Sequence, residues 1–450
     1  MGERRHGILR YARALSGTAA LALLCALGAF VVADRGDRDP APFQRVLDRQ
    51  AAALRAGDER GFLDAVDPQA PRHRGAQRQV FHNLRRLPLS TWAYEVREVA
   101  APHRGGGEAA GSAGSGTAEG NAQGNAQGDT VTVEAVLRYR LADFDRVTTT
   151  ATERFRFVRR DGGWRIADEA SGSDSQLWEQ GAMTVVRGAH SLVLGVGRDR
   201  AELRALADAA DRAVPAVAGT WPDGWSRRTV LEAPASVRQM ARLLGTPAAD
   251  SGTYAGIAAV TTGEAGGASR PGGGRAPADR IVVNPRAYGL LSEEGRQVVL
   301  THETTHVATR RQTTSATPLW LSEGIADWAG YRRSHLAPRE AAPELARAVA
   351  DRAAAGGTAP ALRALPADAD FRFGNDPAGL ARAYEGGWLA CRMVAEEWGA
   401  EKLLALYARA GRAHGGGHPD PDAALRSVLG VGKEQFTERW RAYATRVLGP

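Results

Sequence analysis

Cysteine and lysine are both nearly absent from this chain of 450 residues. The cysteines are Cys25 and Cys391, and two cysteines exclude both a disulfide scaffold and a metal site built from four thiolates. The lysines are Lys402 and Lys433, so arginine supplies nearly all of the positive charge. The basic character of the chain therefore depends on its arginines and on their distribution along the sequence.

The net charge of +7 is not gathered into one basic stripe. Arginines give residues 1–33 a positive surplus, and acidic residues are interleaved with the arginines that follow. Such a mixed pattern is typical of a solvated surface, so we expect no nucleic-acid partner. Hydrophobic residues at 43% and charged residues at 24% exclude wholesale disorder, and the length predicts two or three domains.

Residues 17–33 form an uncharged apolar run directly behind the arginine-bearing segment 1–16. A basic flank followed by an apolar core predicts either a cleaved signal peptide or a transmembrane signal anchor. Small residues up to Ala33 allow cleavage before Asp34, but the run is just long enough to span a bilayer, and we favour an anchor.

The positive-inside rule places residues 1–16 in the cytoplasm and the bulk of the chain outside the membrane. We therefore expect a single-pass protein of the cell membrane with an extracellular C-terminal bulk. Cleavage near Ala33 would make the same protein a secreted one.

Residues 34–172 are expected to form a first domain. Apolar residues recur at helical spacing from Pro42 to Leu87, and strand-like alternation follows. The expected strands cover 91–99, 130–141, 147–158 and, after a turn at Asp161-Gly162-Gly163, 164–168. The glycine-rich segment 104–128 buries too little apolar surface to order itself and is expected to be a disordered loop.

Two or three helices followed by a curved antiparallel sheet resemble the cone of nuclear-transport-factor-2-like domains, over about residues 40–170. This resemblance rests on the order and pattern of the elements. It implies a spacer or ligand-binding module, because no cluster of histidine, aspartate or cysteine stands out in this part of the chain.

A second domain is expected over residues 176–450, after a short linker at 171–175. Its first part alternates strands and helices, and from Ser292 onward the pattern is mostly helical. The expected elements are a strand at 191–197, a helix at 199–218, a strand at 227–233, a helix at 235–244 and strands at 253–262 and 280–284. The expected fold class is α+β, with a mixed sheet subdomain followed by a helical subdomain.

The sequence His302-Glu303-Thr304-Thr305-His306 matches the pattern H-E-x-x-H. Ser292 can cap a helix that carries this segment, with Glu293 and Glu294 complementing the helix dipole in the first turn. Residues four apart share one face of a helix, so both imidazoles can bind one metal ion. Glu303 is then placed to act on the metal-bound water.

A catalytic zinc site needs a third protein ligand, and the next helix offers Glu323. Thr317-Pro318 predicts the start of this helix, with Thr317 as its N-cap and Pro318 at its first position. Asp327 lies one turn after Glu323 and could accept a hydrogen bond from the outward nitrogen of a ligand histidine.

The segments at 302–306 and 320–328 (WLSEGIADW) together resemble the zinc motif and glutamate helix of gluzincin metallopeptidases, specifically the peptidase MA-like family. The resemblance covers about residues 180–450. It implies one Zn²⁺ per chain, with His302, His306 and Glu323 as ligands, Glu303 as general base and Asp327 behind the ligands.

Residues 381–394 (ARAYEGGWLACRMV) resemble the Y-E-x-G segment of aminopeptidase-type gluzincins, in which the tyrosine stabilises the oxyanion. This resemblance implies that role for Tyr384, although the chain has Gly386 where lysine is usual. The alternative is a tyrosine that only packs beside Trp388. No G-A-M-E-N type exopeptidase motif is found, and residues 256–260 stand where such families keep a substrate-binding edge strand, which favours cleavage within a chain.

The sequence thus predicts a zinc-dependent endopeptidase that acts outside the cytoplasmic membrane on a peptide or protein substrate. Membrane association through residues 17–33 is expected if this segment is not cleaved. The alternative is a non-catalytic extracellular binding or scaffold protein on a metallopeptidase-like fold. Retention of Glu303 favours the enzyme, because a protein that has lost catalysis can lose its base while keeping its fold.

Overall fold

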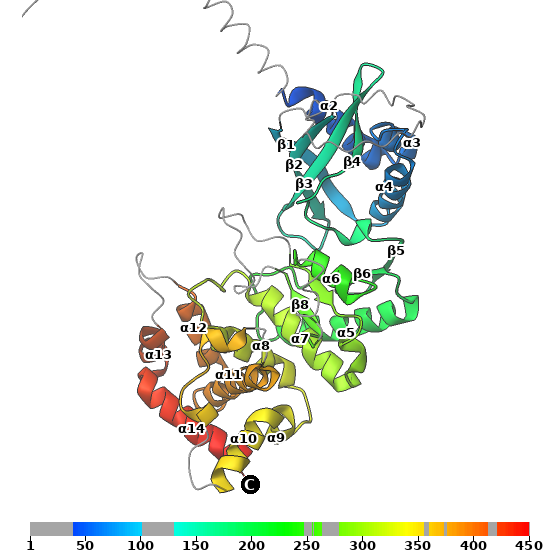
Figure 1. Ribbon diagram of the computed structural model, residues 1–450. Helices are drawn as coiled ribbons and strands as arrows, with labels where there is room; N and C mark the ends of the chain where they lie inside the picture. Colours follow the sequence, from blue (N-terminus) through cyan, green and yellow to red (C-terminus); the bar gives the residue numbers. More distant parts are fainter. Residues whose placement is uncertain are drawn as a thin grey trace, which may run out of the picture.

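The computed structural model describes residues 39–100, 130–246, 254, 256–262, 279–354, 360–372, 376–412 and 421–449. The expected signal segment 17–33 and the expected loop 104–128 lie outside these residues. Within them the protein is α+β, with one antiparallel sheet, one mixed sheet and a helical C-terminal region (Figure 1). This confirms the expected α+β class, with a mixed sheet followed by a helical region. A search of the described helices finds none that is both long enough and apolar enough to cross a bilayer.

The first unit consists of three helices and a four-stranded antiparallel sheet in the order β1-β2-β3-β4. Its elements are α2 (Ala41–Ala56), α3 (Glu59–Asp64), α4 (Pro71–Leu84), β1 (Leu89–Val99), β2 (Thr130–Leu141), β3 (Thr149–Arg160) and β4 (Gly163–Glu169). Burial alternates along β2, as the sequence pattern predicts for a strand with one face on a core.

The turn between β3 and β4 is set by two residues with positive φ, Asp161 at 47° and Gly162 at 75°. Arg160 pairs with Gly163 across the turn. A two-residue hairpin loop of this kind requires the left-handed region at both positions, which aspartate tolerates and glycine adopts freely. The Asp-Gly turn expected from the sequence is therefore present.

The second unit contains a mixed five-stranded sheet in the order β5-β6-β7-β9-β8. Its elements are β5 (Met183–Arg187), β6 (Ser191–Val196), α5 (Arg200–Ala218), β7 (Thr229–Ala233), α6 (Val237–Leu243), β8 (Ala259–Thr261) and β9 (Ile281–Val283). Strands β6, β7 and β9 are parallel, whereas the edge strands β5 and β8 are antiparallel to their neighbours.

Two features of this sheet differ from the sequence prediction. Strand β5 was not expected from the sequence. It forms an antiparallel hairpin with β6. Strand β8 is shorter than the strand expected at 253–262, because the Ile257 N–H donates to the Tyr254 carbonyl and closes a turn before the strand begins.

The mixed sheet is buried on both faces. Val193, Leu231 and Ile281 point to one side and belong to the core that includes α5 and the C-terminal helices. Leu192 and Val230, their neighbours in the strands, point to the other side and pack against the first unit. The two units therefore share a hydrophobic core across this face of the sheet.

Asn83 of α4 joins the two units through its fully buried side-chain amide. Its Nδ2 donates to the carbonyls of Trp178 and Gly181, each at 2.8 Å, and its Oδ1 accepts from the Met183 N–H at 3.0 Å. Trp178 belongs to the single turn η1 (Leu177–Glu179), which connects the units. These three hydrogen bonds fix the path of residues 178–183 along the first unit.

A buried ion pair makes a second connection. The Arg280 guanidinium, next to β9, donates to both carboxylate oxygens of Asp145 at 2.7 and 3.0 Å, and both side chains are buried. Asp145 follows β2 of the first unit. Bidentate geometry offsets the cost of burying both charges, whereas removal of one partner typically costs about 3–5 kcal/mol.

The C-terminal region is helical. The helices are α7 (Glu293–Thr309), α8 (Leu319–Tyr331), α9 (Pro338–Ala341), α10 (Pro343–Ala354), α11 (Pro377–Glu397), α12 (Ala400–Ala410), α13 (Pro421–Leu429) and α14 (Lys433–Leu448). The Ser292 side chain accepts from the Gly295 N–H, so it caps α7 as the sequence predicts.

The expected start of α8 is wrong by one residue. Pro318 is the N-cap, and the Thr317 hydroxyl instead accepts from the Thr314 N–H within the preceding turn. The first N–H of the helix, that of Leu319, donates to the carboxylate of Asp368 at 2.9 Å. A distant aspartate thus satisfies a helix terminus that the local sequence was expected to cap.

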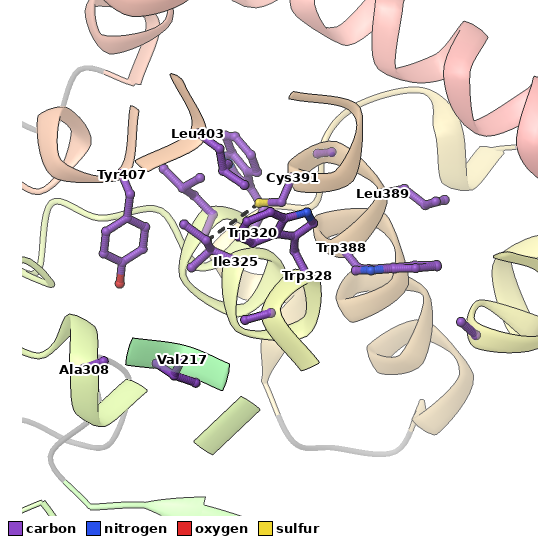
Figure 2. Packing of buried hydrophobic residues seen from close by; sticks show 14 of the residues in the cluster. Val217, Ala308, Trp320, Ile325, Trp328, Trp388, Leu389, Cys391, Leu403 and Tyr407 are labelled. Carbon is purple, nitrogen blue, oxygen red and sulfur yellow. Dashed lines mark hydrogen bonds between the residues drawn. The ribbon is translucent and has the colours of Figure 1, made fainter. Parts of the chain in front are cut away.

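Helix α8 lies between α7 and α11, and glycine allows the close approach on both sides. A Cβ at Gly324 would lie 2.2 Å from the Gly387 carbonyl oxygen of α11, and one at Gly330 would lie 3.0 Å from the Val298 oxygen of α7. Cys391 packs at the same crossing of α8 and α11, among the tryptophans and leucines shown in Figure 2.

We predict that Gly324→Ala destabilises the protein by about 1–3 kcal/mol or more, because the new methyl group overlaps backbone atoms that can move only if α8 and α11 separate. Urea unfolding of the full chain measures this effect. Gly75→Ala is the matched control: nothing lies near Gly75 on α4, so it should stabilise by about 0.5–1 kcal/mol. Equal effects of the two substitutions would contradict the close packing of α8 on α11.

Candidate metal centre

Helix α7 carries the candidate site although it is rich in threonine, which disfavours helices. The hydroxyls of Thr301, Thr305 and Thr309 donate to the carbonyls four residues earlier, at 2.8–2.9 Å. These bonds satisfy three hydroxyls that are buried in the packing around the helix. The helix can therefore pass through the core and still present histidines.

His302 and His306 lie one turn apart on α7, and their Nε2 atoms are 2.9 Å apart. Glu323 enters from α8, and its Oε2 lies 3.4 Å from His302 Nε2 and 3.5 Å from His306 Nε2. The contact between α7 and α8 thus brings together the three expected ligands. Among the described residues, no other group of three or more histidine, cysteine or acidic side chains meets the distance criterion for a metal site.

These three residues fit a zinc ion. Ligand atoms bound at about 2.0–2.1 Å to one tetrahedral zinc lie roughly 3.3–3.4 Å apart. The separations of 2.9, 3.4 and 3.5 Å are close to that edge length. Two imidazole nitrogens and one carboxylate oxygen are also a typical donor set for a catalytic zinc.

Asp327 lies behind the ligands, on the turn of α8 that follows Glu323. Its Oδ1 is 2.7 Å from His302 Nδ1, so Nδ1 donates, and in the neutral imidazole that a metal ion binds the lone pair is on Nε2, toward the other ligands. This is the contact expected from the sequence, and it fixes both the tautomer and the orientation of the ring.

The electrostatics of the cluster favour charge separation between histidine and carboxylate. Burial lowers the pKa of His302, but the Asp327 carboxylate and the bond to Glu323 outweigh it and raise this pKa to about 10. Burial raises the pKa of Glu323, but the imidazoles of His306 and His302 lower it by a larger amount. The pKa of Glu323 is therefore below its usual value. The cluster by itself therefore favours a protonated imidazole beside an ionised Glu323 carboxylate.

Glu303 is buried beside the first ligand and does not belong to the ligand cluster. Its Oε2 accepts a hydrogen bond of 2.6 Å from the Thr261 hydroxyl of β8. Sequence reasoning did not single out Thr261, because the contact joins residues 42 positions apart and nothing in the local pattern of the strand marks it.

Tyr384 of α11 lies next to the cluster, with its ring centroid 6.5 Å from that of His302 and 5.2 Å from that of Phe371. The alternative expectation has Tyr384 pack beside Trp388, whose ring contacts that of Tyr331 at 5.1 Å. Residues i and i+4 share a helix face, yet neighbouring helices give the two rings different partners.

Glu385, the second residue of the Y-E-x-G segment, has a structural contact of its own. Its carboxylate accepts from the backbone N–H groups of Glu344 and Leu345, at the start of α10. Burial raises the pKa of Glu385 to about 7, although these two donors lower it. This residue therefore holds α10 against α11.

We predict that His302→Ala, His306→Ala and Glu323→Ala each abolish tight zinc binding, because two remaining ligands cannot replace a three-residue donor set. Metal analysis of the purified full-length variants after dialysis against zinc measures this. Glu303→Gln is the control, since Glu303 is not in the cluster, and it should keep one zinc per chain. Loss of zinc in this control, or zinc retained in all three ligand variants, would contradict the assigned ligand set.

Comparison with known proteins adds no relative to this description. Scans of protein-family models, of curated proteins and of solved structures find no match to the chain. The functional interpretation of the centre therefore depends on its own residues and their geometry.

Proposed function

We propose that this chain is a zinc-dependent peptidase that hydrolyses peptide bonds outside the cytoplasmic membrane. The observation that carries the proposal is the meeting of His302, His306 and Glu323, whose ligand atoms lie within 4.8 Å of one another, with Glu303 buried beside them. A structural zinc site has no need of a carboxylate next to its ligands, whereas hydrolysis needs a base at that position.

When bound, zinc supplies a Lewis acid that polarises a carbonyl and acidifies a water molecule. The chain supplies the remaining functions. Glu303 accepts the proton of the attacking water and then donates it to the leaving amine. One carboxylate in a fixed position can perform both transfers. Asp327 holds His302 by its Nδ1 throughout, so the ring does not rotate while charge moves beside it.

Tyr384 is proposed as the donor to the oxyanion that forms when the carbonyl is attacked. Its ring lies beside that of His302, while Phe371 packs edge-on against it and restricts its orientation. A preorganised hydroxyl in a site shielded from water stabilises developing negative charge more than it stabilises a neutral carbonyl.

The proposal extends to the family and the location. The resemblance to gluzincins of the peptidase MA-like family supports the assignment of the second unit, and the helix-then-sheet order of the first unit supports a nuclear-transport-factor-2-like domain. The apolar run at 17–33 supports a signal anchor or signal peptide with the bulk of the chain outside the membrane. The short edge strand β8 supports cleavage within a peptide chain, which could add to it by backbone hydrogen bonds.

Glu303→Gln tests the proposal. The substitution removes the base but keeps the size of the side chain, so turnover of a labelled protein such as casein should fall by at least about 10²-fold at unchanged zinc content. The zinc-loaded wild-type chain is the reference. Near wild-type turnover by Glu303→Gln would refute the mechanism, and a fully loaded wild type that cleaves nothing would favour the non-catalytic alternative.

Tyr384→Phe tests the oxyanion donor. Its kcat should fall by about 10²–10³-fold, as after loss of one oxyanion donor, while KM changes little because the bond is made in the transition state. Zinc content and the melting temperature should stay at wild-type values, since the ring and its contact with Phe371 are kept. A variant that turns over at full rate would remove Tyr384 from the mechanism.

A further inference from the structure

The strand β8 reaches the proposed base directly. Thr261 is its last residue and is 1% exposed, and its hydroxyl donates to Glu303 Oε2 at 2.6 Å. The same hydroxyl lies 3.2 Å from the Glu303 backbone carbonyl. The Thr261 hydroxyl thus contacts both the side chain and the backbone of Glu303.

A carboxylate that acts as a base must present one oxygen to the water at a fixed distance and angle. A hydrogen bond to Oε2 restricts rotation of the Glu303 carboxylate and so fixes the direction in which its oxygens point. Threonine suits this task because its branched Cβ limits the hydroxyl to few rotamers. Valine has the same shape but cannot donate.

The position of Thr261 depends in turn on the first unit. Its neighbour Thr262 pairs with Arg280, since the Thr262 N–H donates to the Arg280 carbonyl at 2.8 Å and the Arg280 N–H donates to the Thr262 hydroxyl at 2.9 Å. The Arg280 side chain is held by Asp145 of the first unit in the buried bidentate pair. A continuous series of contacts therefore leads from Asp145 to Glu303.

We propose that Thr261 is a positioning residue for Glu303, and that the first unit keeps the strand carrying Thr261 in place through the Asp145–Arg280 ion pair. This inference rests on the proposed peptidase function and adds to it a role for the N-terminal unit. The first unit is, on this view, a support for the base rather than only a spacer or a ligand-binding module.

Thr261→Val and Thr261→Ser form the central test, with turnover of a quenched fluorescent peptide that the wild type cleaves. Thr261→Val should lower kcat by about 10²-fold, the effect of a misplacement on the order of 1 Å, with little change in KM or zinc content. Thr261→Ser keeps the hydroxyl and should recover most of the turnover. A merely structural role predicts no such difference between valine and serine.

Thr229→Val is the matched control. Thr229 is buried in β7 of the same sheet, and its hydroxyl has no hydrogen-bond partner among the described residues, so its replacement by valine should leave turnover unchanged. Asp145→Asn tests the longer path and should lower kcat by roughly three- to thirtyfold, as expected for coupling through intervening contacts. Full turnover by Asp145→Asn would overturn the role of the first unit.

The stability of the zinc-free chain tests the contact between Thr261 and Glu303 without relying on catalysis. Thr261→Val should lower the urea midpoint of the wild type but should have a clearly smaller effect in a Glu303→Leu background, where the carboxylate acceptor is gone and only the backbone carbonyl at 3.2 Å remains. Additive effects would show that Thr261 does not act on Glu303 and would overturn the inference. Turnover that needs Glu303 but not Thr261 overturns this inference alone, whereas a zinc-loaded wild type without turnover overturns the proposed function itself.

Discussion

The close backbone contact of helix α8 with α7 on one side and α11 on the other is the constraint on which the site depends. Gly324 and Gly330 lie at the two contacts, where a Cβ would overlap main-chain atoms of α11 and crowd a main-chain oxygen of α7, respectively. Helices that approach this closely have little freedom to slide. Glu323 on α8 is therefore held at hydrogen-bonding distance from both histidines of α7, and Tyr384 on α11 is held beside them.

The same packing decides how the polar residues of the centre are satisfied. A buried hydroxyl or imidazole without a partner costs about 1–3 kcal/mol. Thr301, Thr305 and Thr309 of α7 bond back to their own helix, and His302 bonds to Asp327. The His302 and His306 nitrogens and the Glu323 oxygen point toward one another, and this donor set suits a cation. Stability and the proposed metal chemistry thus have the same origin.

The N-terminal unit is part of this structure rather than an appendage to it. The mixed sheet needs cover on both faces, and the first unit covers the face opposite α5 with a shared apolar core. Asn83 and the Asp145–Arg280 pair add directional contacts to that core. Because Arg280 is next to β9 and pairs with Thr262 beside β8, the interface between the units ends close to the proposed base.

The sequence by itself determined the local features of this protein. Helical spacing places His302 and His306 on one face, Ser292 caps their helix, and the Asp161-Gly162 pair turns β3 into β4, because each of these depends on residues a few positions apart. Only the tertiary structure decided that Asp368 caps α8, that the Tyr384 ring lies beside that of His302, and that Thr261 binds Glu303. These contacts join residues 42 to 82 positions apart. Their partners are chosen by the packing of helices and strands, and no local periodicity encodes that choice.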